Sequence, residues 1–295
     1  MTKLHGRLFT VDFSFYLMVV LVVLTGQLTD YLILLIIMTW HECGHYFTAV
    51  VFKWPIEAMR LFMFGCVMDT DAFLMRPYKE QWLVLLMGPL QHVAIASVCI
   101  VLGRYTGYTT FFNHAQQLNI TLLTFNLLPI WPLDGGKILY LLLSVVLPFK
   151  KSYYFTLALS IGSLAIVGSW FMFIHGFSFS ILILIGFLFQ EIRLDSKNRT
   201  YTWYRFLLAR QMLNRQPKIK HIHKNAIPHR LLDDLKLSQP CVWMVKETGQ
   251  FIQEQQMIQL YFNPVKYLNE IGEQSDNTLS FNNANRNITC HIRCR

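Results

Sequence analysis

The residues best suited to chemistry are His41, Glu42 and His45, which form an H-E-x-x-H pattern inside an apolar run from Tyr31 to Phe52. Residues four apart share one face of a helix, so both imidazoles point the same way and the glutamate lies beside them. Two neutral histidines in this arrangement bind Zn²⁺, and the carboxylate serves as general base on water. Because such polar side chains are costly to bury in a membrane helix, a functional zinc site is the default interpretation.

A third zinc ligand must come from elsewhere, since a catalytic zinc takes three protein ligands and leaves one position open. Besides Glu42, only Asp134 is an acidic residue embedded in a stretch expected to cross the membrane. It lies between Asn126 and Lys137, where two prolines and two glycines prevent a regular helix. A break at membrane depth is tolerated where it lines a cavity, so we predict that it directs Asp134 toward the metal. The alternative is an interfacial N-cap ahead of Lys137.

The elements that must position these residues are transmembrane helices. The 295-residue chain is 54% hydrophobic and 15% charged, as in a multi-pass α-helical membrane protein. We expect about six transmembrane helices, at residues 11–28, 31–52, 81–102, 117 onward with a break at 126–136, 153–174 and 177–190. Residues 57–73 are too short to cross, and a re-entrant or interfacial β-type loop fits them best.

The distribution of basic residues predicts the orientation. One set of loops carries nearly all of the lysines and arginines between the spans: Lys3, Arg7, Lys53, Arg60, Arg76, Lys79, Lys150 and Lys151. Only Arg104 falls in a loop on the other side. The positive-inside rule therefore places both termini in the cytoplasm. His41 then lies roughly 18 Å from the outer end of its helix, so water must reach it through a polar route from the cytoplasm.

The C-terminal part is expected to form a small cytoplasmic α/β domain. We divide the chain into an intramembrane domain (1–195), a basic linker (196–225), the α/β domain (226–272) and a disordered tail (273–295). The α/β domain should contain a helix at 227–237, strands at 241–245 and 251–252, and a helix at 254–262. Most of the 26 lysines and arginines follow residue 192, which suits anionic lipid or an acidic partner. Without a recognition motif, no direct nucleic-acid binding is expected.

Other histidines and one cysteine have simpler interpretations. His92 could be a polar contact near the site, but a hydrogen-bonded packing histidine is favoured. His221, His223 and His229 could bind metal, yet they fall in the basic linker and are interpreted as part of it. Cys43 faces away from the histidine pair and is assigned to packing.

The two metal motifs together resemble the site-2 protease family of intramembrane metalloproteases. That family pairs His-Glu-x-x-His with Asn-x-x-Pro-x-x-Pro-Leu-Asp-Gly-Gly, here residues 41–45 and 126–136. The stretch Gly88-Pro89-Leu90-Gln91-His92 makes the chain similar to the stage IV sporulation protein FB branch. The resemblance covers residues 1 to about 270 and is specific at the two motifs. One departure is Gly65-Cys66, where relatives tend to have a glycine pair.

The resemblance implies a zinc endopeptidase that cleaves a membrane-associated sporulation sigma factor precursor, pro-sigma-K. Carried over by position, Glu42 is the catalytic base and the zinc ligands are His41, His45 and Asp134. Asn126 and Pro132 fall where the family helps to hold substrate as an extended strand. The C-terminal domain resembles a single CBS repeat, which implies ATP sensing and a homo-oligomer. Inhibitory membrane partner proteins are also implied.

Two alternatives stay open. The chain could be a general site-2 protease that cleaves anti-sigma factors or signal-peptide remnants. It could also be a non-catalytic metal transporter or receptor that uses the histidine pair to bind its cargo. Replacement of Glu42 separates these classes, because a carboxylate that moves protons is needed for cleavage and not for metal binding.

Overall fold

The chain forms two compact units. The computed structural model describes residues 9–62, 65–70, 73–176, 179–210, 218–222, 228–237, 240–246 and 251–262. The first unit comprises residues up to Leu143 together with Tyr153–Thr200, and the second comprises Ser144–Ser152 together with residues after Thr200. The tail predicted at 273–295 lies outside the described residues.

The first unit is built mainly from helices: α1 (Phe13–Thr25), α2 (Leu28–Val51), α3 (Tyr78–Thr106), α4 (Thr109–Asn126), α5 (Asp134–Val146), α6 (Phe149–His175) and α7 (Phe179–Lys197). The prediction of a helical chain with a break after Asn126 is confirmed. Two boundaries differ by more than four residues from those expected. Helix α4 begins at Thr109 instead of near 117, and α7 continues to Lys197, which supplies the length that an apolar stretch ending at 190 lacked.

A small sheet is formed by one strand that precedes α1 and two strands that lie between α2 and α3 in the chain. Strand β1 (Phe9–Val11) pairs in parallel with β2 (Ala58–Phe62), and β2 pairs antiparallel with β3 (Gly65–Asp69), which leaves β3 at the edge. The β character predicted within 57–73 is therefore confirmed at residues 58–62 and 65–69, and the re-entrant or interfacial position stays a prediction. Strand β1 was not predicted, because Val11 is apolar and was assigned to the first helix. Asp12 separates the two elements by accepting a hydrogen bond from the Ser14 amide at 2.9 Å, as an N-cap does.

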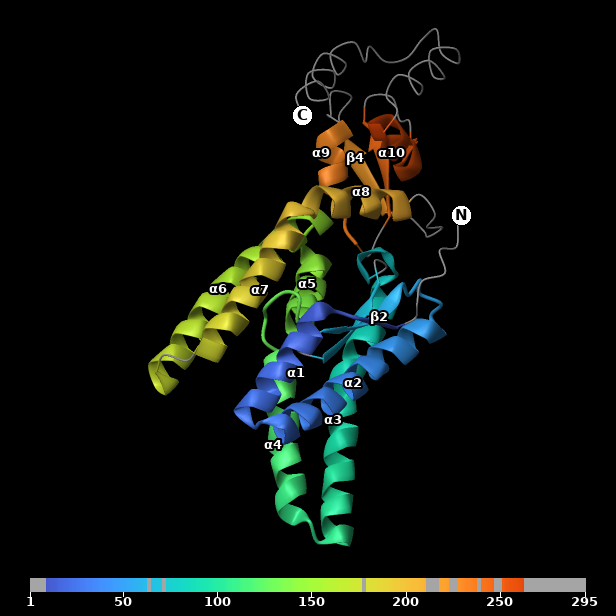
Figure 1. Ribbon diagram of the computed structural model, residues 1–295. Helices are drawn as coiled ribbons and strands as arrows, with labels where there is room; N and C mark the ends of the chain where they lie inside the picture. Colours follow the sequence, from blue (N-terminus) through green and yellow to red (C-terminus); the bar gives the residue numbers. More distant parts are fainter. Residues whose placement is uncertain are drawn as a thin grey trace. The chain divides into compact units, whose positions relative to one another are not determined.

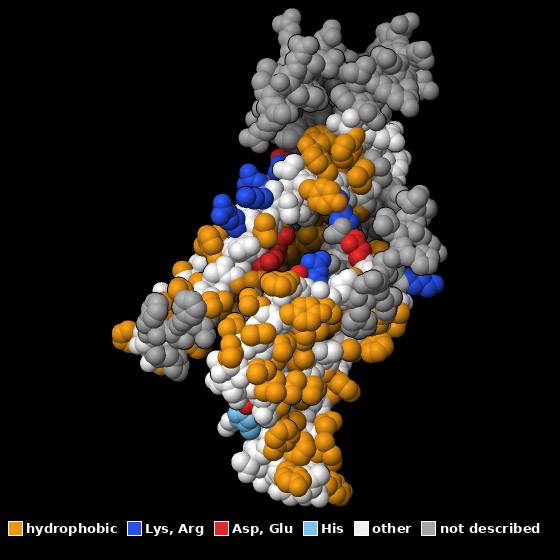
Figure 2. Space-filling model, viewed as in Figure 1, with side chains coloured by type: hydrophobic (Ala, Val, Ile, Leu, Met, Phe, Trp, Pro, Cys, Tyr) orange, Lys and Arg blue, Asp and Glu red, His pale blue; other side chains and the backbone are white. Residues whose placement is uncertain are grey.

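Helices α2, α3 and α4 share a core around Ile33, Ile37, Cys99 and Ala115. Figure 1 shows α3 and α4 side by side as a hairpin that α2 crosses. On their outer faces large apolar side chains are exposed, such as Leu86, Leu90 and Val93. Figure 2 shows apolar side chains spread over this part of the first unit, with few charged ones among them. Such a surface suits contact with lipid.

Two of the described helices, Tyr78–Thr106 and Phe149–Ile174, are long and apolar enough to cross a membrane, and Phe13–Thr25 is apolar but shorter. Helix α2 has sufficient length, but its buried histidines and glutamate lower its mean hydropathy. The six spans therefore stay a prediction, whereas the mostly helical character is established.

The second unit is an α/β module. It contains α8 (Arg199–Arg210), β4 (Lys218–Ile222), α9 (Pro228–Asp233), β5 (Cys241–Val245), β6 (Phe251–Gln253) and α10 (Glu254–Phe262). Strand β5 lies between β4, to which it is parallel, and β6, to which it is antiparallel. The elements predicted at 227–262 are thus confirmed within a few residues. Residues 247–250, between β5 and β6, are outside the described part.

Residues 196–225, expected to be a linker, contribute to this module. Helix α8 buries Trp203, Phe206 and Leu207, and β4 adds a strand to the sheet. The buried Arg210 pairs with Glu254, whose other oxygen accepts a hydrogen bond from the Cys241 amide at 2.8 Å. The linker expectation did not include these packing contacts, which depend on distant residues. The side chains of His221, His223 and His229 lie outside the described residues.

Candidate metal centre

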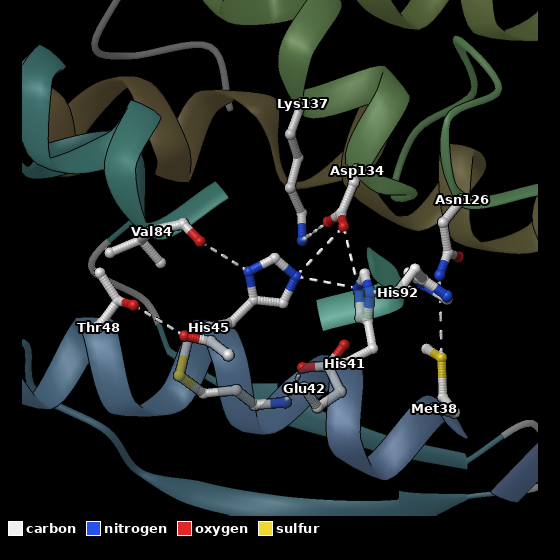
Figure 3. A network of polar contacts seen from close by, with 12 residues as sticks. Met38, His41, Glu42, His45, Thr48, Val84, His92, Asn126, Asp134 and Lys137 are labelled. Atoms are coloured by element: carbon white, nitrogen blue, oxygen red, sulfur yellow. Dashed lines mark hydrogen bonds and ion pairs between the residues drawn. The ribbon is translucent and has the colours of Figure 1, made fainter. Parts of the chain in front are cut away.

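The histidine pair lies one turn apart on α2. His41 and His45 are buried, with 1% and 5% of their surface exposed, and their Nε2 atoms are 3.1 Å apart. The helical spacing of the H-E-x-x-H pattern accounts for this arrangement, since residues four apart project from the same face. Both rings therefore present one nitrogen to the same small volume (Figure 3).

Asp134 completes the group from the start of α5. Its Oδ2 lies 3.0 Å from Nε2 of His41 and 3.2 Å from Nε2 of His45, and the side chain is buried. Figure 3 shows the carboxylate above the two rings, at the N-terminus of its helix. The positive end of the helix dipole favours a carboxylate there. The structure thus brings together the three side chains predicted as ligands from segments 89 residues apart.

The three atoms fit a zinc ion. Ligands at about 2.0–2.1 Å in a tetrahedral arrangement lie about 3.3 Å from one another, close to the three separations found here. Two imidazole nitrogens and one carboxylate oxygen also match the donor set of catalytic zinc sites, in which the fourth position stays open. Lys137 Nζ lies 3.8 Å from the other oxygen of Asp134 and partly balances the carboxylate, and a zinc ion would be the common partner of the three ligand atoms.

The break between α4 and α5 sets the position of Asp134. A Cβ atom on Gly135 would lie 2.2 Å from the carbonyl oxygens of both Leu127 and Leu128, so a side chain there would push the break away from α5. The break is also anchored at Trp131, whose backbone amide donates to Ser160 Oγ at 2.9 Å and whose indole donates to Asp195. The Pro and Gly residues of this segment therefore build a turn that no continuous helix could make.

Glu42 lies between the metal ligands and the sheet. Its side chain is buried, and one of its carboxylate oxygens lies within 4.8 Å of a ring nitrogen of each histidine. Glu42 Oε2 accepts a hydrogen bond from the Met68 amide of β3 at 3.3 Å. Because Met68 uses its N–H in this way, the edge of β3 faces the site.

The two residues assigned to substrate lie near the break. Asn126 is buried at the end of α4, and its amide lies 3.9 Å from Sδ of Met38 on α2. Pro132 is half-buried and follows a cis peptide bond with Trp131. Cys66, which stands where relatives tend to have the second glycine of a pair, is buried in β3 opposite Leu61.

The groups that orient the ligands were only partly predicted, since a polar contact near the site was the less favoured interpretation of His92. Nδ1 of His45 lies 2.8 Å from the Val84 carbonyl of α3, and Nδ1 of His41 lies 3.1 Å from Nε2 of His92. His92 therefore contacts a ligand instead of serving only as packing. The one signal for it was its place in the Gly-Pro-Leu-Gln-His stretch. A backbone carbonyl such as that of Val84 carries no sequence signal.

Removal of the acidic ligand should release the metal. We expect Asp134→Ala to lower zinc affinity by more than about 100-fold, because loss of an outer-shell partner alone typically costs 10- to 100-fold. Metal analysis of the purified full chain, with chelator competition, measures this. Asp30→Ala is the matched control, since Asp30 is exposed and pairs with His114 away from the site. Equal zinc affinity in both variants would exclude Asp134 as a ligand.

The family comparison is consistent with this site. The family model "Peptidase family M50" matches residues 30–107 and 104–168, a region that contains all of the candidate ligands.

Two curated proteins are similar to the chain. One is stage IV sporulation protein FB of Bacillus subtilis, 37% identical over 191 residues, which cover 63% of this chain and 65% of that protein. The other is a zinc metalloprotease of Methanocaldococcus jannaschii, 27% identical over 197 residues, which cover 63% of this chain and 55% of that protein. The chain thus spans less than two thirds of the length of these relatives.

A solved structure shares the fold. The site-2 protease from Methanocaldococcus jannaschii superposes with a TM-score of 0.51 and 24% sequence identity, covering 66% of this chain and 94% of that one. At this identity the likeness establishes the fold alone.

Proposed function

Over residues 30–168 the chain belongs to peptidase family M50, and from that premise we propose that it is an intramembrane zinc endopeptidase. The observation that carries the proposal is the convergence of His41, His45 and Asp134 on one point beside Glu42. The apolar outer faces of the helices support a location in the bilayer. The distribution of basic residues supports cytoplasmic termini.

The residues divide the chemistry between them. His41, His45 and Asp134 would hold the ion; a bound zinc lowers the pKa of a water molecule to near neutrality and polarises the scissile carbonyl. Glu42 takes the proton from the attacking water and passes it to the leaving amine nitrogen. The Met68 amide keeps the Glu42 carboxylate oriented toward the ligand side chains.

The substrate is proposed to bind as an extended strand. A helical peptide hides its carbonyls in backbone hydrogen bonds, so a local unwinding must precede attack. The unwound segment can then add to the outer edge of β3, which pairs with no second strand among the described residues, as peptides add to other sheet edges. The Met68 amide already points from this edge toward Glu42, so a strand there would lie next to the general base. Asn126 and Pro132 are proposed to hold the other side of that strand.

The proposed substrate is a membrane-associated sporulation sigma factor precursor, pro-sigma-K. Support comes from the similarity to stage IV sporulation protein FB. The order β4-α9-β5-β6-α10 supports a CBS-like second unit, a regulatory domain that would act in a homo-oligomer. ATP binding there and inhibitory membrane partners rest on the family resemblance alone.

Co-expression with the precursor tests the proposal. We expect the chain to shorten pro-sigma-K in membranes, and we expect a zinc chelator to stop cleavage and added zinc to restore it. Immunoblots of the precursor report the product. Cleavage of an anti-sigma factor or a signal-peptide remnant with an intact precursor would favour the general site-2 protease. Zinc binding without cleavage of any of these substrates would favour the transporter or receptor.

A further inference from the structure

A buried row of polar groups continues from the metal site into the helix bundle. It runs from His41 on α2 to His92 on α3 and Asn119 on α4, and all three are at most 2% exposed. We propose that His92 and Asn119 are positioning residues that fix the tautomer of His41 and so keep its Nε2 available to the metal. The inference rests on the zinc site of the proposed function.

The proton positions can be assigned from the Asn119 end of this row, because two contacts determine the orientation of the Asn119 amide. Its Nδ2 donates to the backbone carbonyl of His92 at 3.0 Å, so its Oδ1 is the atom that faces His92 Nδ1 at 2.7 Å. An amide oxygen can only accept a hydrogen bond. His92 must therefore carry its ring proton on Nδ1.

The proton on His92 Nδ1 in turn determines the tautomer of the ligand His41. With the proton on Nδ1, neutral His92 has a lone pair on Nε2, which lies 3.1 Å from His41 Nδ1. His41 then donates from Nδ1, and its Nε2 keeps the lone pair that points toward Asp134 and His45. Figure 3 shows His92 beside His41, on the side away from His45. Each link in the row thus determines the next.

The other histidine reaches the same tautomer by simpler means. His45 Nδ1 faces the Val84 carbonyl, which can only accept and needs no further partner. His92, in contrast, can carry its proton on either nitrogen, so it orients His41 only while Asn119 holds that proton on Nδ1. All three side chains are buried, so these contacts are not open to bulk water. A neutral acceptor also adds no further charge at membrane depth, where charge is costly.

Three substitutions at His92 separate this role from packing. The side-chain oxygen of Gln lies near the position of Nε2 and can still accept from His41, whereas Asn reaches only toward Asn119. Phe fills the volume and does neither. We expect His92→Asn and His92→Phe to lower zinc affinity about 10- to 100-fold, the usual cost of an outer-shell partner, and His92→Gln to stay much closer to the wild type.

Asn119→Leu provides a second test from another helix. It leaves the ligand and His92 intact but removes the acceptor that sets the tautomer of His92. We expect lower zinc affinity, and we expect its effect to vanish when His92 is already Phe, because residues that act through one another are not additive. His114→Phe, at an exposed position on the same helix, should leave zinc affinity unchanged.

The measurements are zinc affinity by chelator competition and the visible absorption of the Co²⁺-loaded full chain in detergent, with circular dichroism to establish folding. If the wild type binds no zinc, the proposed function fails and this inference with it. If the wild type binds zinc but His92→Asn and His92→Gln have the same affinity, the positioning role alone is overturned. Additive effects of Asn119→Leu and His92→Phe would overturn it as well, even where His92→Asn fails to fold.

Discussion

Glu42→Gln is expected to abolish peptide cleavage while the full chain still binds one zinc ion. Glutamine has nearly the same size and keeps an oxygen that can accept from the Met68 amide, but it cannot take a proton. The ligand atoms of His41, His45 and Asp134 are untouched. Loss of general acid–base catalysis costs about 10²- to 10⁴-fold in rate. Cleavage of the co-expressed precursor and zinc content of the purified variant together measure the two effects.

Glu57→Gln is the matched control, because Glu57 is exposed just before β2 and lies outside the site. It should cleave at the wild-type rate. Full cleavage by Glu42→Gln would remove Glu42 from the mechanism. A metal-dependent transport activity that persists in Glu42→Gln would favour the transporter, since the histidine pair and Asp134 would then suffice.

Gly88→Ala is expected to eliminate both zinc binding and cleavage. A Cβ atom on Gly88 of α3 would lie 2.2 Å from Nε2 of His45 and 2.8 Å from Cε1 of His41, so the methyl group would displace both rings. Alanine adds one carbon and is a better helix former than glycine by about 1 kcal/mol, so the helix itself should be retained. Displacement of two ligands should cost more than the roughly 10- to 100-fold typical of an outer-shell loss.

Gly162→Ala on α6 is the control for the added methyl group, because a Cβ atom there would meet nothing within 4 Å. Zinc content, cleavage and helical circular dichroism should match the wild type. Retention of zinc by Gly88→Ala, in a variant that folds, would mean that α3 does not lie against the histidine pair as found here.

Much of the site follows from local sequence. The shared face of His41 and His45 follows from helical periodicity, and the break before Asp134 follows from the backbone restrictions of proline and glycine. The strand character of residues 58–62 and 65–69 and the elements from Pro228 onward were also predictable, because alternation and turn residues act over short distances. These features depend on neighbouring residues in the sequence and not on contacts with distant segments.

Other features depend on contacts between distant segments. Strand β1 forms because β2, far along the chain, supplies its hydrogen-bonding partner. The proximity of Gly88 to the histidine rings depends on how α3 crosses α2, and the link from Asn119 through His92 depends on α4 as well.

The sequence by itself therefore determined which residue types could bind a metal and which segments would carry them. Only the tertiary structure decided that Asp134 Oδ2 lies 3.0 Å from His41 and that Met68 reaches Glu42. The physical reason is that backbone preferences act over a few residues, whereas distances between helices are set by the packing of side chains from several segments at once.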